Sequence, residues 1–193
     1  MRLTLALCTN NPNKVKELSA LLPQFNVCLY QAITGKRIDV VEDGTTFEEN
    51  AIKKVSSMPI KESVVFMSDD SGLEVDAFNG EPGIHSARLG GDNVTSTEQC
   101  QIILKRLGNS KHRGAQFTCV IALRFPDGSI KTSRGIVRGE ITSTLIGEGG
   151  FGYDPIFRPE GYEKTFSELK PEIKNSISHR YQAINLALKI LES

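Results

Sequence analysis

The sequence predicts an α/β fold whose sheet is at least partly antiparallel. An apolar run over residues 3–8 leads through a polar turn into a helical pattern, a succession typical of α/β proteins. Two further apolar runs, 117–125 and 130–138, flank the turn sequence Pro126-Asp127-Gly128-Ser129, which predicts a hairpin. A length of 193 residues suits one domain, so we assign residues 1–193 to a single domain.

The composition limits the partners that the chain can have. Hydrophobic and charged residues make up 39% and 24% of the sequence, as in ordinary soluble proteins. Lysine plus arginine equals aspartate plus glutamate, 23 against 23, so no bulk charge favours nucleic acid or a membrane surface. Any phosphate binding must therefore come from a few placed groups. No apolar run reaches membrane-spanning length, and the first residues are too short for a secretory signal, so we expect a cytoplasmic protein.

Four cysteines are scattered along the chain: Cys8, Cys28, Cys100 and Cys119. None belongs to a C-x-x-C pair, and each lies in an apolar or helical run. We therefore expect reduced thiols in the core and no metal site built from cysteine.

The first strand, 3–8, ends in the sequence Thr9-Asn10-Asn11-Pro12-Asn13-Lys14. Asn11 can cap a helix and Pro12 can take its first position, and Val15, Leu18 and Leu22 then recur at helical spacing. The N-terminus of such a helix binds anions through free N–H groups, and Lys14 adds a positive charge. The alternative is a plain capped helix with a solvated lysine, and the motif alone does not decide between the two.

Residues 27–30 fit a second strand, and 31–44 are polar and irregular. Thr46 and Glu49 have the spacing of a capping box, which predicts a helix that ends before Pro59.

The central stretch follows the apolar run 64–67. We expect this strand to stop at Asp69 and Asp70, which precede Ser71 and Gly72. Carboxylates at the end of a buried strand are typical of ligand sites in open α/β sheets, and their hard oxygens suit Mg²⁺. Adjacent strand residues point to opposite faces, so we expect only one of the two aspartates to bind the ion directly. A solvated acidic turn explains the same letters equally well.

Beyond this stretch, residues 73–77 alternate as a half-buried strand does. Ser96 and Gln99 have capping-box spacing, which predicts a helix that ends at Gly108. After the hairpin, strands should continue towards Ile146.

The loop Gly147–Asp154 is rich in glycine and carries one phenylalanine, Phe151. A flat ligand could stack on this ring, as bases stack on aromatic side chains elsewhere. The alternative is that the loop tucks Phe151 into the core.

The apolar spacing of the last segment predicts a helix that buries Ile184, Leu188 and Leu191 and has Ser178 as its N-cap. His179 and Arg180 then lie in its first turn, where both can donate hydrogen bonds, and Lys174 lies just upstream. A helix running unbroken from Ile173 would place Lys174 and His179 on different faces. Simple capping plus surface charge explains the same residues without a ligand.

Taken together, the motifs resemble those of the inosine triphosphate pyrophosphatase family. They are T-N-N-P-N-K, F-E-E-N-A, D-D-S-G-L-E-V, G-E-P-G-I-H-S-A-R, G-G-F-G-Y-D-P-I-F and S-H-R-Y-Q-A, and they extend from Thr9 to Ala183. The resemblance implies a homodimer whose subunit has a long twisted mixed sheet flanked by helices, with two lobes around a central cleft. It also implies Mg²⁺-dependent hydrolysis of ITP, dITP or XTP to the monophosphate and pyrophosphate.

Carried over residue by residue, the resemblance assigns a role to each motif. Thr9, Asn10, Asn11, Pro12, Asn13 and Lys14 would line the triphosphate. Asp70 would be the catalytic acidic residue and the magnesium ligand, and Ser71 would contact the substrate. Phe151, Gly152, Tyr153 and Asp154 would hold the base, Lys174 would reach the nucleotide, and His179 with Arg180 would read the base edge.

The sequence departs from the family pattern at one position. Members commonly carry a metal-binding glutamate where this chain has Val41, and Glu42 or Asp43 are the neighbouring candidates for a second ligand. Two other functions are compatible with the motifs. One is a Maf-like pyrophosphatase acting on pyrimidine or modified nucleotides, and the other is a non-catalytic nucleotide sensor.

Overall fold

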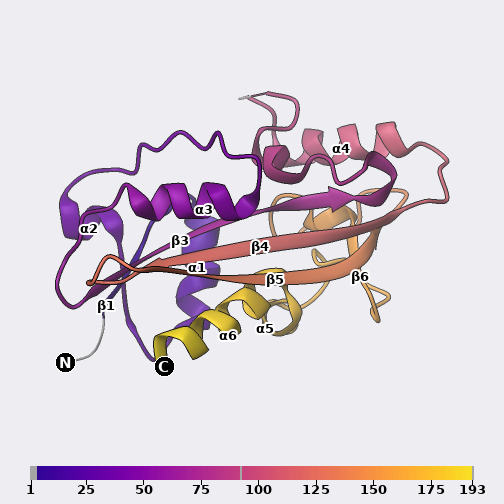
Figure 1. Ribbon diagram of the computed structural model, residues 1–193. Helices are drawn as coiled ribbons and strands as arrows, with labels where there is room; N and C mark the ends of the chain where they lie inside the picture. The colour runs from indigo at the N-terminus through magenta and orange to yellow at the C-terminus, as the bar shows by residue number, and fades with distance from the viewer. Residues whose placement is uncertain (1–3, 92, 193) are drawn as a thin grey trace. The chain divides into compact units, whose positions relative to one another are not determined.

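The computed structural model describes residues 4–91 and 93–192. Its six-stranded sheet has the order β2-β1-β3-β4-β5-β6, and Figure 1 labels β1, β3, β4, β5 and β6. The strands are β1 (Thr4–Leu7), β2 (Asn26–Leu29), β3 (Val64–Val75), β4 (Gly114–Arg124), β5 (Ile130–Ile141) and β6 (Phe157–Pro159). β1 pairs in parallel with β2 and β3, whereas β5 and β6 are antiparallel. The predicted mixed sheet is therefore confirmed, as are the helices that flank it; the cleft stays a prediction.

The chain forms two compact units, each assembled from stretches far apart in sequence. The first unit comprises Met1–Asp70, Cys119–Gly135 and Arg180–Ser193, and the second comprises Ser71–Thr118 and Ile136–His179. β3, β4 and β5 contribute residues to both units. The assignment of residues 1–193 to a single domain stays a prediction.

In the first unit, helices cover both faces of the strands. The helices are α1 (Pro12–Leu21), α2 (Tyr30–Thr34), α3 (Phe47–Ser56) and α6 (His179–Glu192), the last from Arg180 onward. Leu7 and Met67 pack with Leu18 and Ile184, whereas Ala6 and Phe66 belong to a separate cluster. Figure 1 shows α3 and α6 on opposite sides of these strands. Strands buried on both faces are apolar throughout, which explains the continuous runs in the sequence.

In the second unit, one face of the sheet is apolar and the other is polar. Its helices are α4 (Ser96–Leu107) and α5 (Pro171–Ile177), with the 3-10 helices η1 (Asp76–Phe78), η2 (Gly83–Arg88) and η3 (Asp154–Ile156). Val75, Phe117 and Val137 join the core, while the intervening Gln116 and Arg138 remain accessible. This alternation is typical of antiparallel sheets with one solvated face.

The prediction that the central strand stops at Asp69 was wrong. β3 runs unbroken from Val64 to Val75, with Asp69 and Asp70 only 1% and 7% exposed. Neighbouring cations and an amide offset the cost of burying these carboxylates, so the strand does not need to end there. β3 then ends at Val75, and Ala77 lies in η1.

Three other boundaries differ from the prediction. The capping box of α4 is Thr95 with Glu98, because the Gln99 amide donates instead to the Ala87 and Leu89 carbonyls. Residues 31–34, expected to be irregular, belong to α2. β5 ends at Ile141, short of Ile146, where the Thr142 hydroxyl donates to the Thr144 carbonyl.

The four cysteines are free thiols; Cys8, Cys100 and Cys119 are buried and Cys28 is half-buried. Burial raises the pKa of Cys8 and of Cys119 to about 12, so these thiols stay protonated at neutral pH. Over residues 4–91 and 93–192, none of the helices is both long and apolar enough to cross a bilayer.

Candidate active site

Asp69 and Asp70 lie in the middle of β3 and point to opposite faces, as predicted. The Asp69 carboxylate lies 2.9 Å from Lys14 Nζ of α1 and 3.7 Å from Arg180 Nη2 of α6. The Asp70 carboxylate instead accepts a hydrogen bond from Asn50 Nδ2 of α3, at 3.1 Å. Each helix-covered face of the first unit thus carries one of the two carboxylates.

Asp69 is held in its ionised form. Burial by itself disfavours the charge, but Lys14, Arg180 and Lys54 outweigh that effect and keep the pKa of Asp69 well below its ordinary range. The same pairing raises the pKa of Arg180, despite burial that opposes it, and Arg180 also forms an ion pair with Glu17. Asp69 is therefore a fixed negative charge that orients Lys14.

Asp70 has the opposite behaviour. Burial raises the pKa of Asp70 to about 6, although Lys14, the Asn50 hydrogen bond and Lys54 act to lower it. The negative charge of Glu42 raises it further. The ionised carboxylate is thus incompletely compensated by the protein, and an added cation would stabilise it.

Asn50 joins the Glu42 loop to Asp70. Its side-chain oxygen accepts from Gly44 N at 2.8 Å, while its amide nitrogen donates to Asp70. A Cβ on Gly44 would lie 2.7 Å from that oxygen, so this approach requires glycine. Glu42 in turn pairs with Lys54 Nζ at 3.0 Å, and Lys54 also donates to the Asp69 carbonyl at 2.9 Å.

We call these side chains the carboxylate cluster: Lys14, Glu42, Asn50, Lys54, Asp69, Asp70 and Arg180. Of the two candidates for a second metal ligand, only Glu42 belongs to it, because Asp43 is exposed and pairs with Lys53. Over the described part of the chain, no three His, Cys, Asp or Glu side chains gather into a metal-binding group. A few carboxylate oxygens fit Mg²⁺, which commonly takes one or two carboxylates and completes its shell with water and substrate phosphates.

The turn at residues 9–14 has the predicted geometry. Asn11 Oδ1 accepts from Asn13 N and Lys14 N, and Pro12 takes the first position of α1. The Thr9 hydroxyl oxygen accepts from Asn11 N at 3.1 Å. These bonds fix an exposed helix N-terminus next to the Lys14 ammonium.

The second unit brings together a different set of predicted residues. Lys174 Nζ lies 2.6 Å from Asp154 Oδ2, and both side chains are buried. The same carboxylate oxygen accepts from Phe151 N at 2.8 Å. The Lys174 ammonium lies over the rings of Phe151 and Phe166, 4.7 Å and 5.7 Å from their centroids. Phe151 is thus half-buried beneath a cation. This lies between the two predictions, a ring available for stacking and a ring tucked into the core.

Further aromatic contacts extend this group. The His179 ring stacks on Phe117 at 4.8 Å with an interplanar angle of 13°, and Phe117 also contacts Phe157 and Phe166. We call this set the aromatic cluster: Phe117, Phe151, Asp154, Phe157, Phe166, Lys174 and His179. Tyr153 is buried and donates to the Ser86 carbonyl at 2.7 Å, and the Cys100 thiol donates to the Gly152 carbonyl at 3.4 Å. These two bonds fix the backbone of the glycine-rich loop.

The predicted site residues thus fall into both units. Lys14, Asp70 and Arg180 belong to the first, whereas Lys174 and His179 belong to the second. The helix does break at Ser178, whose backbone is extended between α5 and α6, so the unbroken-helix alternative is wrong. Ser71 is half-buried in the second unit.

The sequence motifs did not point to Lys54 or to Asn50. Both are buried, four residues apart on one face of α3, and both bind β3. Their spacing beside the apolar Ala51 and Val55 was the available signal, because polar residues on a buried stripe require partners.

Comparison with known proteins identifies relatives along nearly the whole chain. The model of the Ham1 family matches residues 5–190. A dITP/XTP pyrophosphatase of Flavobacterium johnsoniae is 43% identical, over 97% of each chain. One from Desulforamulus reducens is 46% identical, over 97% of this chain and 94% of that protein. The structure of the Staphylococcus aureus Ham1 protein superposes with a TM-score of 0.88 at 42% identity, covering 98% of both chains.

Proposed function

Because the chain belongs to the Ham1 family, we propose that it hydrolyses non-canonical purine nucleoside triphosphates. The substrates would be ITP, dITP and XTP, and the products the nucleoside monophosphate and pyrophosphate. Such a reaction removes these nucleotides from the cellular pool. The similarity to dITP/XTP pyrophosphatases over 97% of the chain supports the proposal.

The observation that carries the proposal is the carboxylate cluster. It combines an incompletely compensated carboxylate, Asp70, with the ammonium groups of Lys14 and Lys54. A polyphosphate bound to a divalent cation matches this distribution of charge, since the cation neutralises the carboxylate and the lysines bind phosphate oxygens. An ordinary surface ion pair would need neither the burial nor the polar bridge through Asn50.

In the proposed reaction, water attacks the α-phosphorus and the bond to the oxygen that bridges the α- and β-phosphorus breaks. Pyrophosphate leaves with the bridging oxygen, and the water proton passes to a carboxylate. Asp69 suits this role poorly, because, despite burial, Lys14 and Arg180 keep its pKa well below the ordinary range and make it a weak base. Asp70 is therefore the proposed acceptor. Asp69 instead positions Lys14, which with the N-terminus of α1 would bind the triphosphate.

We propose Asp70 and Glu42 as the residues that hold Mg²⁺. Glu42 takes the place of the glutamate expected at Val41, whose side chain is 70% exposed. When bound, Mg²⁺ would neutralise negative charge on the phosphate oxygens. Asn50 donates to one Asp70 oxygen and so keeps the carboxylate in a defined direction.

The aromatic cluster is the proposed base-binding group. Phe151 offers a flat face, and Lys174, Asp154 and His179 supply polar groups beside it. Hypoxanthine and xanthine have a carbonyl at position 6 where adenine has an amino group, so hydrogen-bond donors would favour them. A buried donor facing the adenine amino group would cost about 1–3 kcal/mol.

A substrate panel scored by pyrophosphate release tests the proposal. We expect multiple turnovers with ITP, dITP and XTP, and far slower release with ATP, dTTP and UTP. Preference for dTTP or UTP would indicate the Maf-like alternative, and binding without turnover would indicate a sensor. Excess chelator should stop the reaction, and added Mg²⁺ should restore it.

A homodimer and a cytoplasmic location are also part of the proposal. The free, buried thiols suit a reducing compartment. Light scattering after size-exclusion chromatography gives the molecular mass in solution. A measured mass equal to that of one subunit would contradict the proposed homodimer.

A further inference from the structure

The second unit contains a cavity of about 460 Å³ whose lining includes no member of the aromatic cluster. The lining comes from the loop before β4, from β5 and from the chain at β6. Four basic residues contribute to it, namely Lys111, Arg113, Arg138 and Arg158, against the acidic Glu140 and Glu160. We call it the basic cavity. Its volume lies within the range of roughly 300–1,000 Å³ of small-molecule sites.

Arg113 is a fixed positive charge in the wall of this cavity. Its Nε donates to the Ile141 carbonyl and its Nη2 to the Thr142 carbonyl, both at 2.6 Å, and Nη1 donates to the Gly108 and Ser110 carbonyls. All these partners are neutral, and within residues 4–91 and 93–192 no carboxylate pairs with this guanidinium. Its charge is therefore oriented but not neutralised by the described chain.

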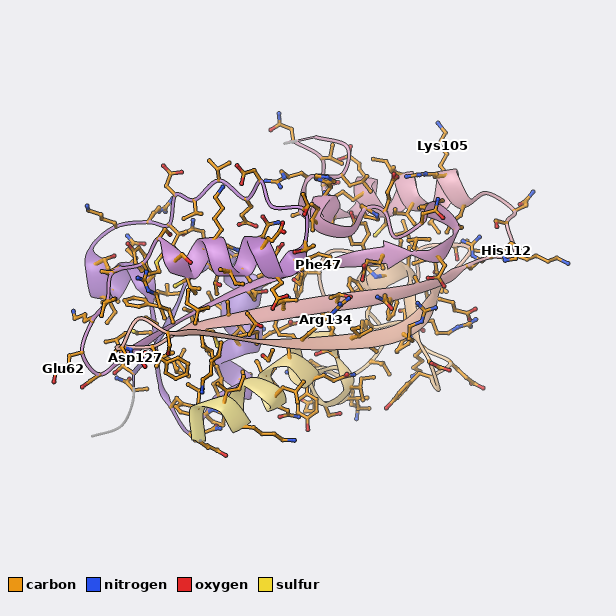
Figure 2. The ribbon with its side chains drawn as sticks, in the orientation of Figure 1. Phe47, Glu62, Lys105, His112, Asp127 and Arg134 are labelled. Atoms are coloured by element: carbon orange, nitrogen blue, oxygen red, sulfur yellow. The ribbon has the colours of Figure 1, made fainter. Side chains whose placement is uncertain are left out.

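Lys111 adds a second charge of this kind. It is exposed, it lines the cavity two residues before Arg113, and no carboxylate of the described residues pairs with it. His112, labelled in Figure 2, lies between them in this loop. Of the two acidic residues in the described lining, Glu140 pairs with an arginine of the same lining, which leaves Glu160 against these two cations, so the balance of charge favours a negatively charged ligand.

The other two arginines can contribute at low cost. Arg138 pairs with Asp76 and Arg158 with Glu140, and all four side chains are between 41% and 49% exposed. Two parallel hydrogen bonds hold Arg138 on Asp76. Nε and Nη2 of Arg158 instead both donate to one oxygen of Glu140, so exchanging the carboxylate for a ligand phosphate is less costly at Arg158. A guanidinium binds phosphate with two parallel hydrogen bonds, which favours that exchange.

We propose that the basic cavity binds a small phosphorylated anion, at a site separate from the two clusters described above. Inorganic pyrophosphate and a nucleoside monophosphate both carry the required chemistry. They differ in whether an organic part is present to contact the Tyr162 ring, which lines the cavity and is 38% exposed. The proposal does not depend on the hydrolytic activity, because binding is measured without turnover.

Calorimetric titration with inorganic pyrophosphate, in chelator, tests the proposal. A Lys14→Ala background removes one of the two lysines that are proposed to bind phosphate in the first unit. We expect this variant to bind one pyrophosphate per chain, and the additional changes Lys111→Ala and Arg158→Ala to weaken that binding about tenfold or more. Both added positions are exposed enough for the fold to persist, which the melting temperature checks.

The matched control adds Lys105→Ala and Arg134→Ala to the same background. These residues are exposed, are labelled in Figure 2 and do not line the cavity. Their replacement removes one lysine and one arginine, the same positive charge as in the cavity variant. If pyrophosphate binding weakened equally in the cavity and control variants, the proposal would be overturned, as it would be if the Lys14→Ala variant did not bind pyrophosphate.

The same titration with inosine monophosphate distinguishes the two sources of phosphate. Tighter binding of inosine monophosphate, lost on Tyr162→Leu, would assign the site to an organic phosphate; tighter binding of pyrophosphate would assign it to inorganic phosphates.

Discussion

The carboxylate cluster and the aromatic cluster both bury charged side chains, but they balance those charges differently. In the first, Lys14, Lys54 and Arg180 surround two aspartates, and Asp70 still has a raised pKa. In the second, one lysine faces one carboxylate at 2.6 Å, and aromatic rings fill the surroundings.

This difference indicates what each cluster can accept. An incompletely compensated carboxylate next to lysines is stabilised by a metal-bound polyphosphate, which brings charges of both signs. A neutralised pair among rings gains little from another charge, but it offers a flat apolar surface with hydrogen-bonding groups at fixed positions. The predictions below test this contrast, from the largest expected effect to the smallest.

Replacing Asp70 by Asn should reduce kcat for ITP by about 10³-fold, because the variant cannot ionise at this position. The fold should persist and, in metal-free buffer at pH 7, be more stable, because a carboxylate with a raised pKa opposes folding when it is ionised. Steady-state pyrophosphate release and urea unfolding measure the two effects. Asp43→Asn, which changes an exposed carboxylate, is the matched control; full activity in the Asp70 variant would remove this residue from the mechanism.

Replacing Arg180 by Ala should lower the free energy of unfolding by about 3–5 kcal/mol, because Asp69 and Glu17 lose a buried partner. Urea unfolding measures this, and Arg134→Ala, at an exposed position of β5, should change it by less than about 0.5 kcal/mol. If Arg180 also reads the base edge, the variant raises KM for ITP and narrows the preference for ITP over ATP. An unchanged preference would restrict Arg180 to its ion pairs.

The metal-free protein should lose stability as the pH rises from about 4 to 6. Asp70 has a folded pKa of about 6 against an ordinary value of 3.8, so the folded state binds the proton more tightly over this interval. The expected loss is about 2–3 kcal/mol. Asp69 does not mask it, because the stability that a lowered pKa provides is present above about pH 4 and is lost only in stronger acid. Urea unfolding in chelator should show the trend in the wild type and its absence in Asp70→Asn.

Replacing Phe151 by Leu should raise KM for ITP about tenfold, because a stacked base loses its aromatic partner. Inhibition by pyrophosphate should be unchanged, since pyrophosphate has no base. If the binding of ITP and of pyrophosphate weakened to the same extent, the change would disturb the loop as a whole.

The sequence predicted the elements whose signals are local. The Asn11 cap, the turn at Pro126–Ser129 and the break at Ser178 depend on a few neighbouring residues, and the structure confirms each. The predicted strand stop at Asp69 was wrong because distant lysines and an arginine neutralise the buried charge. The part played by Lys54 in the site was missed for the same reason.

The sequence by itself determined the succession of strands and helices, and its motifs indicated the family to which the chain belongs. Only the tertiary structure decided that Asp69 is a fixed anion whereas Asp70 has a pKa near 6. The two residues are adjacent and chemically identical, so no local pattern separates them. The pKa of a buried carboxylate depends on the charges within a few ångströms, and here those charges come from positions 14, 42, 54 and 180, which only folding brings to β3.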